Sequence, residues 1–206
     1  MLKMFRQSLP LLGALFCSAA PAQVRPAQVH STDIDVAVTY VAERGKIAPS
    51  DCGCFWLQGG SLDTALTFYR GLGVAANLTG GHNDDIASGV ELDKVAFMLG
   101  PRYTVRASDW WHRGTPGMMG GAAIFGEGLI GGVHSFNTVV PTAAGTAGAA
   151  SSFAFQVGGG VDVPLGKRLG IRLVEADFVR STLPNGGNDV QHDLRLAAGI
   201  SFHLRP

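Results

Sequence analysis

The stretch GEGLIG at residues 126–131 has the spacing G-x-G-x-x-G, which in dinucleotide-binding enzymes lets the backbone approach a pyrophosphate. That chemistry requires a strand before the glycines, a helix after them and an acidic residue about 20 positions further on. The segment that follows is GVHSFNTVVPTAAG, in which β-branched residues, Asn137 and Pro141 do not favour a helix. The first acidic residue after Glu127 is Asp162. The sequence therefore indicates no nucleotide or other cofactor site here.

A CGC motif, Cys52 and Cys54, is the second group that could do chemistry. In an oxidising compartment two cysteines could join as a disulfide, although a spacer of one residue makes the ring strained. A metal could instead be held if His82, Asp84 and Asp85 approach the thiols from another loop. The spacing C-x-C alone is a weak signal, so we expect a disulfide or unreactive thiols and no metal site.

Residue pairs for hydrolysis are missing from the sequence. No serine lies in G-x-S-x-G, and the six histidines show no metal-binding spacing such as H-E-x-x-H. His134 and Ser135 are neighbours, but adjacent residues of a strand point to opposite faces of the sheet. We therefore predict that the protein is not an enzyme.

The elements that must carry these residues are strands, because apolar and polar residues alternate with a period of two. The clearest case is LRLAAGISF, in which apolar positions 194, 196, 198, 200 and 202 alternate with the others. Tilted transmembrane strands have about 9–11 residues. The sequence predicts eight such strands, approximately at 34–42, 55–68, 71–80, 93–105, 119–133, 152–163, 169–180 and 192–204.

Composition agrees with a closed antiparallel barrel. Only 16% of the residues are charged, 29 are glycine and the mean hydropathy is positive. After the apolar run near the beginning of the chain, however, no stretch has about 18 continuous apolar residues, as a transmembrane helix would need. A barrel reconciles these facts because its apolar residues are spread over one face of many strands. The net charge is zero, so nothing indicates a nucleic-acid partner.

The beginning of the sequence predicts export. Lys3 and Arg6 precede an apolar run that ends near Ala20-Pro21-Ala22, which is the pattern of a secretory signal peptide. We predict a signal peptide at 1–22, a disordered lead at 23–31 and the barrel at 32–204. Longer connections after the first, third, fifth and seventh predicted strands indicate outer loops, which places both termini in the periplasm.

With these features the chain resembles the small OmpA-like outer-membrane barrels, whose domain has eight strands. The resemblance covers about residues 32–204 and is carried by the strand count, the connections and the last two strands, GIRLVEADFVRSTLPNG and HDLRLAAGISFHL. It implies a monomer in the bacterial outer membrane, in contact with lipid and inserted by the barrel-assembly machinery. Members of this family end in an aromatic residue, whereas Leu204 followed by Arg205 and Pro206 stands here.

If the apolar face meets lipid, alternation turns charged residues inward. The interior of an eight-stranded barrel is just wide enough for side chains to fill it, and buried opposite charges should pair. We predict that Glu127, between two glycines, pairs with Arg102. The inward-facing set comprises Asp63, Lys94, Arg102, Glu127, Asp162, Glu175, Asp177, Asp193 and Arg195. Within it we propose an interior network of Arg102, Glu127, Glu175, Asp177 and Arg195.

The function that follows is a structural or surface-interaction role in the outer membrane, with the interior plugged by polar and charged side chains. One alternative is a small pore for ions or solutes, gated by Arg195 or Arg102. Another is a secreted, soluble, lipocalin-like protein that binds an apolar ligand, which requires apolar residues inside the barrel.

Overall fold

The computed structural model describes residues 32–46, 53–87, 90–107, 121–142, 145–185 and 189–204, and these form one closed barrel. Its strands are β1 (Asp33–Lys46), β2 (Cys54–Tyr69), β3 (Leu72–Ala87), β4 (Val90–Arg106), β5 (Ala123–Thr142), β6 (Gly145–Pro164), β7 (Leu169–Ser181) and β8 (Gln191–Leu204). The predicted signal peptide and lead, at 1–22 and 23–31, and also Cys52 lie outside the described residues.

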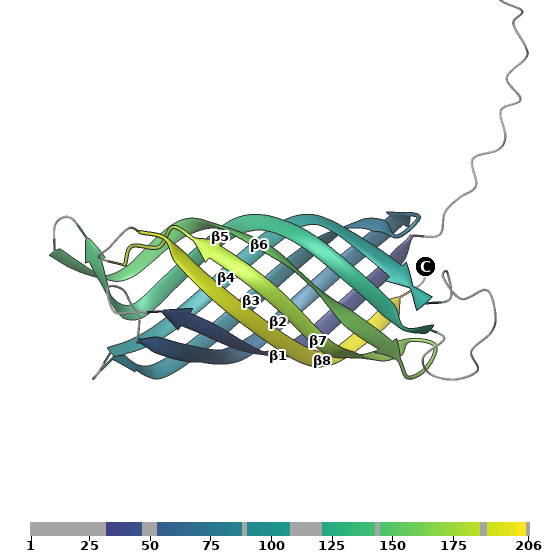
Figure 1. Ribbon diagram of the computed structural model, residues 1–206, viewed down its shortest axis with the longest axis horizontal. Helices are drawn as coiled ribbons and strands as arrows, with labels where there is room; N and C mark the ends of the chain where they lie inside the picture. The colour runs from purple at the N-terminus through teal and green to yellow at the C-terminus, as the bar shows by residue number, and fades with distance from the viewer. Residues whose placement is uncertain are drawn as a thin grey trace, which may run out of the picture.

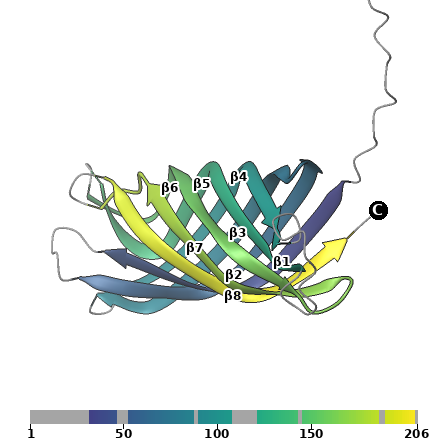
Figure 2. The same cartoon turned by 45° about the vertical axis from the view of Figure 1, so that its right-hand side comes forward.

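Each strand pairs antiparallel with the next along the chain, and β1 pairs with β8 to close the barrel. Figure 1 and Figure 2 show the strongly tilted strands wound around a common axis, with the start of β1 beside the end of β8. Ile34 and Leu204 are partners at this junction. The predicted all-β fold of eight strands is therefore confirmed. Among the described residues, no helix is long and apolar enough to span a membrane.

The alternation of the sequence separates two faces of the barrel wall. Large apolar side chains point outward along every strand, for example Tyr40, Phe97, Ile130 and Phe153, each more than half exposed. Side chains between them point inward and are buried, many of them polar or charged. The apolar part of the interior combines small residues such as Ala75 with larger ones such as Met98 and Leu129. The barrel is thus apolar outside and largely polar inside.

Several strands are longer than predicted at the end opposite the two termini. β3 continues to Ala87, β5 continues to Thr142 and β6 begins at Gly145, so the predicted long loops at 81–92 and 134–151 are mostly paired hairpins. The prediction was wrong here because these strand ends lie beyond the apolar belt, the band of large apolar side chains on the outward face of the barrel. Where both faces of a strand meet water, the alternation that reveals a strand disappears.

The connections also differ from the predicted contrast of long outer loops and short turns. At the end that carries the termini, β2 and β3 are joined through a tight turn at Arg70 and Gly71, both with positive φ. At this same end the connection between β4 and β5 spans 107–122, which is longer than the connections 47–53 and 182–190 at the other end. Connection length therefore does not distinguish the two ends of this barrel.

Candidate functional site

The barrel interior concentrates the ionisable groups of the chain. Among the described residues, eleven charged side chains are buried, and seven of them are acidic. They are Glu43, Asp63, Lys94, Arg102, Glu127, Asp162, Arg172, Glu175, Asp177, Asp193 and Arg195. All five residues of the proposed network belong to this set. The set divides into two clusters along the barrel axis, joined by one amide side chain.

The first cluster begins with Arg102 on β4 and Glu127 on β5, which are direct partners in the ladder. The Nε of Arg102 donates to Oε2 of Glu127 at 2.7 Å, so the two residues predicted to pair are in contact. The other side of the guanidinium reaches across the lumen to Asp63 on β2, with its two terminal nitrogens 2.7 and 2.8 Å from the two carboxylate oxygens. Arg102 is therefore bonded to carboxylates on two different strands.

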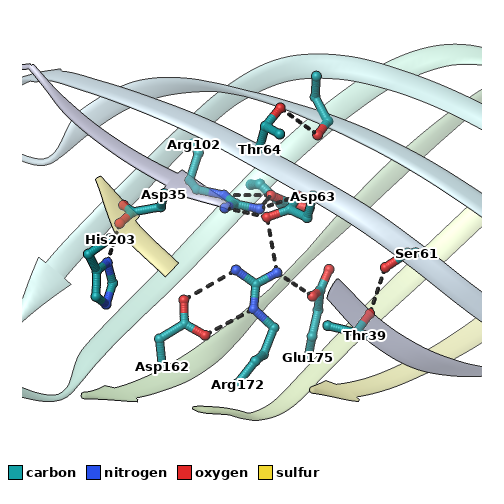
Figure 3. Close-up of polar contacts among 12 residues, drawn as sticks. Asp35, Thr39, Ser61, Asp63, Thr64, Arg102, Asp162, Arg172, Glu175 and His203 are labelled. Carbon is teal, nitrogen blue, oxygen red and sulfur yellow. Dashed lines mark hydrogen bonds and ion pairs between the residues drawn. The ribbon is translucent and has the colours of Figure 1, made fainter. Parts of the chain in front are cut away.

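A second guanidinium, Arg172 on β7, completes this cluster (Figure 3). Its Nε and Nη2 bond both oxygens of Asp162 at 2.9 and 3.2 Å, and its Nη1 bonds Glu175 at 2.7 Å. The same Nη1 lies 3.0 Å from Oδ1 of Asp63, so one aspartate joins the two arginines. The ring of Phe125 contacts both guanidinium groups. Its centroid lies 4.2 Å from the Cζ of Arg102 and 4.5 Å from the Cζ of Arg172.

Arg172 is missing from the residues expected inside, because β7 contains a bulge. The pairing with β8 shifts between Arg172 and Glu175, and the pairing with β6 shifts between Val161 and Asp162. Two consecutive residues, Leu173 and Val174, are consequently both exposed. A bulge reverses the alternation along the strand, so Arg172 turns inward together with Glu175.

The second cluster lies toward the end opposite the termini and is centred on Lys94 of β4. Its ammonium group bonds Asp193 of β8 at 2.6 Å and also bonds Glu43 of β1. The other oxygen of Glu43 accepts a hydrogen bond from Nε of Arg195 at 3.1 Å. Glu43 was not among the predicted residues, because it lies one position past the predicted end of the first strand although the alternation of β1 continues through it.

Gln156 on β6 joins the two clusters. Its Oε1 accepts from Nη1 of Arg195 at 2.9 Å, and its Nε2 donates to Oε1 of Glu127 at 3.1 Å. The side chain is completely buried. An amide can do this because it carries a donor and an acceptor on one planar group. The network therefore runs continuously from Lys94 to Arg172.

Asp177 is the exception within this network. Its side chain is 1% exposed, and neither carboxylate oxygen accepts a hydrogen bond from an amide, hydroxyl, ammonium or guanidinium group of the described residues. Arg195 is its ladder partner on β8, yet the side chain of Arg195 bonds Glu43 and Gln156 instead. A buried carboxylate without a donor is costly, so Asp177 requires a separate explanation.

Cavities lie at the two mouths of the barrel. The larger one, of about 640 Å³, opens at the end that carries the termini and is lined by Arg102, Arg106, Asp162 and His203 among others. Here His203 and Asp35 are hydrogen-bonded (Figure 3). The other, of about 160 Å³, lies at the opposite end and reaches Lys94 and Asp193. The paired clusters lie between these two cavities.

At the rim opposite the termini, His82 on β3 bonds two carboxylates. Its ring nitrogens lie 2.6 Å from Asp84 and 2.6 Å from Asp93, beyond Leu78, the last strongly exposed apolar residue of β3. Hydrogen bonds to Asp84 and Asp93 raise the pKa of the His82 imidazole above its ordinary value. Hydrogen bonds from Asn137 and His82 lower the pKa of Asp93. Both ring nitrogens of His82 are therefore engaged by carboxylates, one from β3 and one from β4.

The remaining sequence candidates lie apart from the interior. Cys54 is exposed and accepts a hydrogen bond from Arg44 at 3.3 Å, and the disulfide with Cys52 stays a prediction because Cys52 is outside the described residues. His134 bonds Ser151 of β6 at 2.7 Å rather than its neighbour Ser135. No described carboxylate bonds the second ring nitrogen of His134, which the base of a catalytic triad would need to fix its orientation.

Neither a protein-family model nor a curated protein matches the chain. Solved structures share its fold. Ail, the attachment invasion locus protein of Yersinia pestis, is 14% identical with a TM-score of 0.55, over 84% of this chain and 99% of that chain. A structure of Ail in complex with the heparin analogue sucrose octasulfate is 15% identical with a TM-score of 0.53, over 84% and 99% of the two chains. Neisserial surface protein A is 12% identical with a TM-score of 0.53, over 83% and 96%. The chain therefore has the fold of the small eight-stranded outer-membrane barrels, as its resemblance to OmpA-like proteins implied.

Proposed function

We propose that the protein is an integral protein of the bacterial outer membrane with a structural role, closed to ions and solutes by its own side chains. The observation that carries this proposal is a set of ion pairs that cross the lumen between strands that are not neighbours. Arg172 on β7 and Arg102 on β4 both bond Asp63 on β2. Lys94 on β4 bonds Asp193 on β8.

The outer surface supports residence in a membrane. Charged side chains that face lipid cost about 2–4 kcal/mol at the middle of the bilayer, whereas apolar ones are favourable there. The central part of the outward face carries large apolar residues on every strand, and the eleven buried charged residues of these strands lie on the inner face. We expect a monomer in contact with lipid, inserted by the barrel-assembly machinery, with both termini in the periplasm and no enzymatic activity.

The strand ends beyond the apolar belt support a role in surface contacts as well. β5 and β6 stay paired out to Thr142 and Gly145, well past Ile130 and Phe153 on their lipid-facing sides. This hairpin displays mainly small and uncharged residues. The structural role, which the buried ion pairs support, is the primary proposal.

The two alternatives from the sequence fit the structure less well. A lipocalin-like binder needs an apolar interior, and the described interior holds eleven charged side chains. A pore needs a continuous lumen, and the ion pairs separate the cavities at the two mouths.

Conductance tests this proposal. Protein refolded in detergent is first shown to be folded by its heat-dependent gel shift and is then added to planar bilayers beside a porin as positive control. We expect no discrete conductance steps from the refolded chain. In a separate experiment, we expect the protein to stay in the membrane fraction after a carbonate wash. Reproducible steps would contradict the plug, and release by carbonate would contradict membrane residence.

A further inference from the structure

The buried charges do not balance. Seven acidic and four basic side chains are buried among the described residues, so the interior carries three excess negative charges if every group is ionised. A buried charge that no opposite charge compensates is strongly unfavourable. Protons or a bound cation must therefore neutralise part of the interior.

The excess is concentrated at one place. Glu127, Glu175 and Asp177 lie close together, with one carboxylate oxygen of each within 4.8 Å of the other two. Glu127 and Glu175 also bond Arg102 and Arg172, but both oxygens of Asp177 are buried and lack a described donor. A buried carboxylate without a donor thus lies beside two other carboxylates, where a cation would compensate its charge.

We propose that Glu127, Glu175 and Asp177 form a calcium site inside the barrel. Carboxylate oxygens are the hard ligands that Ca²⁺ prefers, at about 2.3–2.6 Å, so opposite ligands around one ion are separated by up to about 5 Å. One oxygen of each of the three carboxylates lies within 4.8 Å of the others, so a single ion could contact all three. Each acid offers one oxygen, and Asp177, whose two oxygens both lack a donor among the described residues, can bind through both; Ca²⁺ accepts such an irregular set of oxygen ligands.

Calcium fits better than magnesium at this position. Mg²⁺ requires shorter and nearly octahedral coordination and usually keeps several waters. None of the three carboxylate residues lines the cavity at either mouth, so the site lies in the interior between the two cavities. For the same reason the ion would be taken up most readily while the barrel folds.

The sheet geometry explains how the three groups meet. Glu175 and Asp177 are two positions apart on β7 and therefore point to the same face. Glu127 lies on β5, and the strand between them, β6, presents Gly158 and Gly160 opposite these acids. Because β6 has no side chain at these two inward positions, carboxylates from β5 and β7 can approach each other across it.

Calcium binding by the whole refolded chain tests the proposal. Wild-type protein is refolded in zwitterionic detergent at neutral pH with CaCl₂ or with EGTA, and bound calcium is counted by equilibrium dialysis with ⁴⁵Ca. We expect one tightly bound ion per barrel. We also expect Tm to be about 5–10 °C higher for protein refolded with calcium at 100-fold excess over Kd.

Two substitutions locate the site. Asp177→Asn keeps the shape of the side chain and removes its charge, so it should abolish the bound ion and the calcium dependence of Tm. Asp85→Asn, at an exposed acid on the rim, is the matched control and should bind calcium like the wild type. The proposal is overturned if wild-type protein binds no calcium, which would mean that protons balance the three acids, or if Asp177→Asn binds as the wild type does.

Discussion

Gly158 on β6 lies directly opposite Asp177 on β7, and the carboxylate of Asp177 occupies the space that a side chain at position 158 would need. A Cβ at Gly158 would lie 1.9 Å from Oδ1 of Asp177 and 2.5 Å from the carbonyl oxygen of Ala176. The same row of ladder partners continues from Glu127 through Gly158 and Asp177 to Arg195. Glycine is therefore part of the charged interior, because it makes the room in which acidic side chains lie.

The first prediction concerns this glycine. Gly158→Ala should destabilise the barrel by about 1–3 kcal/mol, because an extra methyl group forces a packed interior to shift. Gly128→Ala is the control, since a Cβ there meets no atom within 4 Å. Urea unfolding of both variants in liposomes measures the difference. Equal stability of the two variants would show that the interior around Asp177 relaxes freely.

The second prediction concerns Arg172. Arg172→Ala leaves three buried carboxylates without their shared cation, so the free energy of unfolding should fall by about 3–5 kcal/mol. Arg180→Ala is the control on the same strand. Because Arg180 is exposed, its replacement should lower the free energy of unfolding by less than about 1 kcal/mol. The loss is measured by urea unfolding and by the temperature of the gel shift. A similar effect of the two substitutions would mean that the buried pairs contribute little.

The third prediction is a pH dependence at the rim opposite the termini. The pKa of His82 is raised in the folded barrel by its two carboxylate partners. The protonated ring therefore stabilises the folded state fully below the unfolded pKa of about 6.5, and this stabilisation is lost as the pH rises through the folded pKa. Asp84→Asn removes one of the two hydrogen-bonded carboxylates and should lower the pKa of His82. NMR titration of the histidine ring measures this value in wild type and variant. An unchanged midpoint would contradict the contact with Asp84.

Much of the fold could be predicted from sequence because the bilayer imposes a simple rule on each strand. A residue of a membrane barrel faces either lipid or the lumen, so alternation at positions such as Leu194 and Arg195 indicates both the strand and its orientation. The same rule placed Arg102 and Glu127 on the inner face. Their direct pairing needed one more assumption, that consecutive strands are neighbours, which holds in an up-and-down barrel.

The features that were missed lie where this rule does not operate. Arg172 is turned inward by a bulge, and strict alternation from Glu175 would have placed Leu173 inside and Arg172 against lipid. The adjacent apolar residues Leu173 and Val174 between two charged ones were the available signal, since a lipid-facing arginine is costly. The ends of β3, β5 and β6 opposite the termini lack such a signal, because they extend past the large apolar residues that face outward.

The central claim is that the apolar face of each strand meets lipid and the charged face lines a closed lumen, and spin labelling of β8 tests it most directly. With the three native cysteines replaced by serine, a nitroxide is attached singly at Leu194, Leu196, Ala198, Ile200 and Phe202 in liposomes. We predict that oxygen, which concentrates in lipid, relaxes these labels more than a water-soluble nickel complex does, with the largest ratio near Ala198. Greater access of the nickel complex along this face would contradict the account.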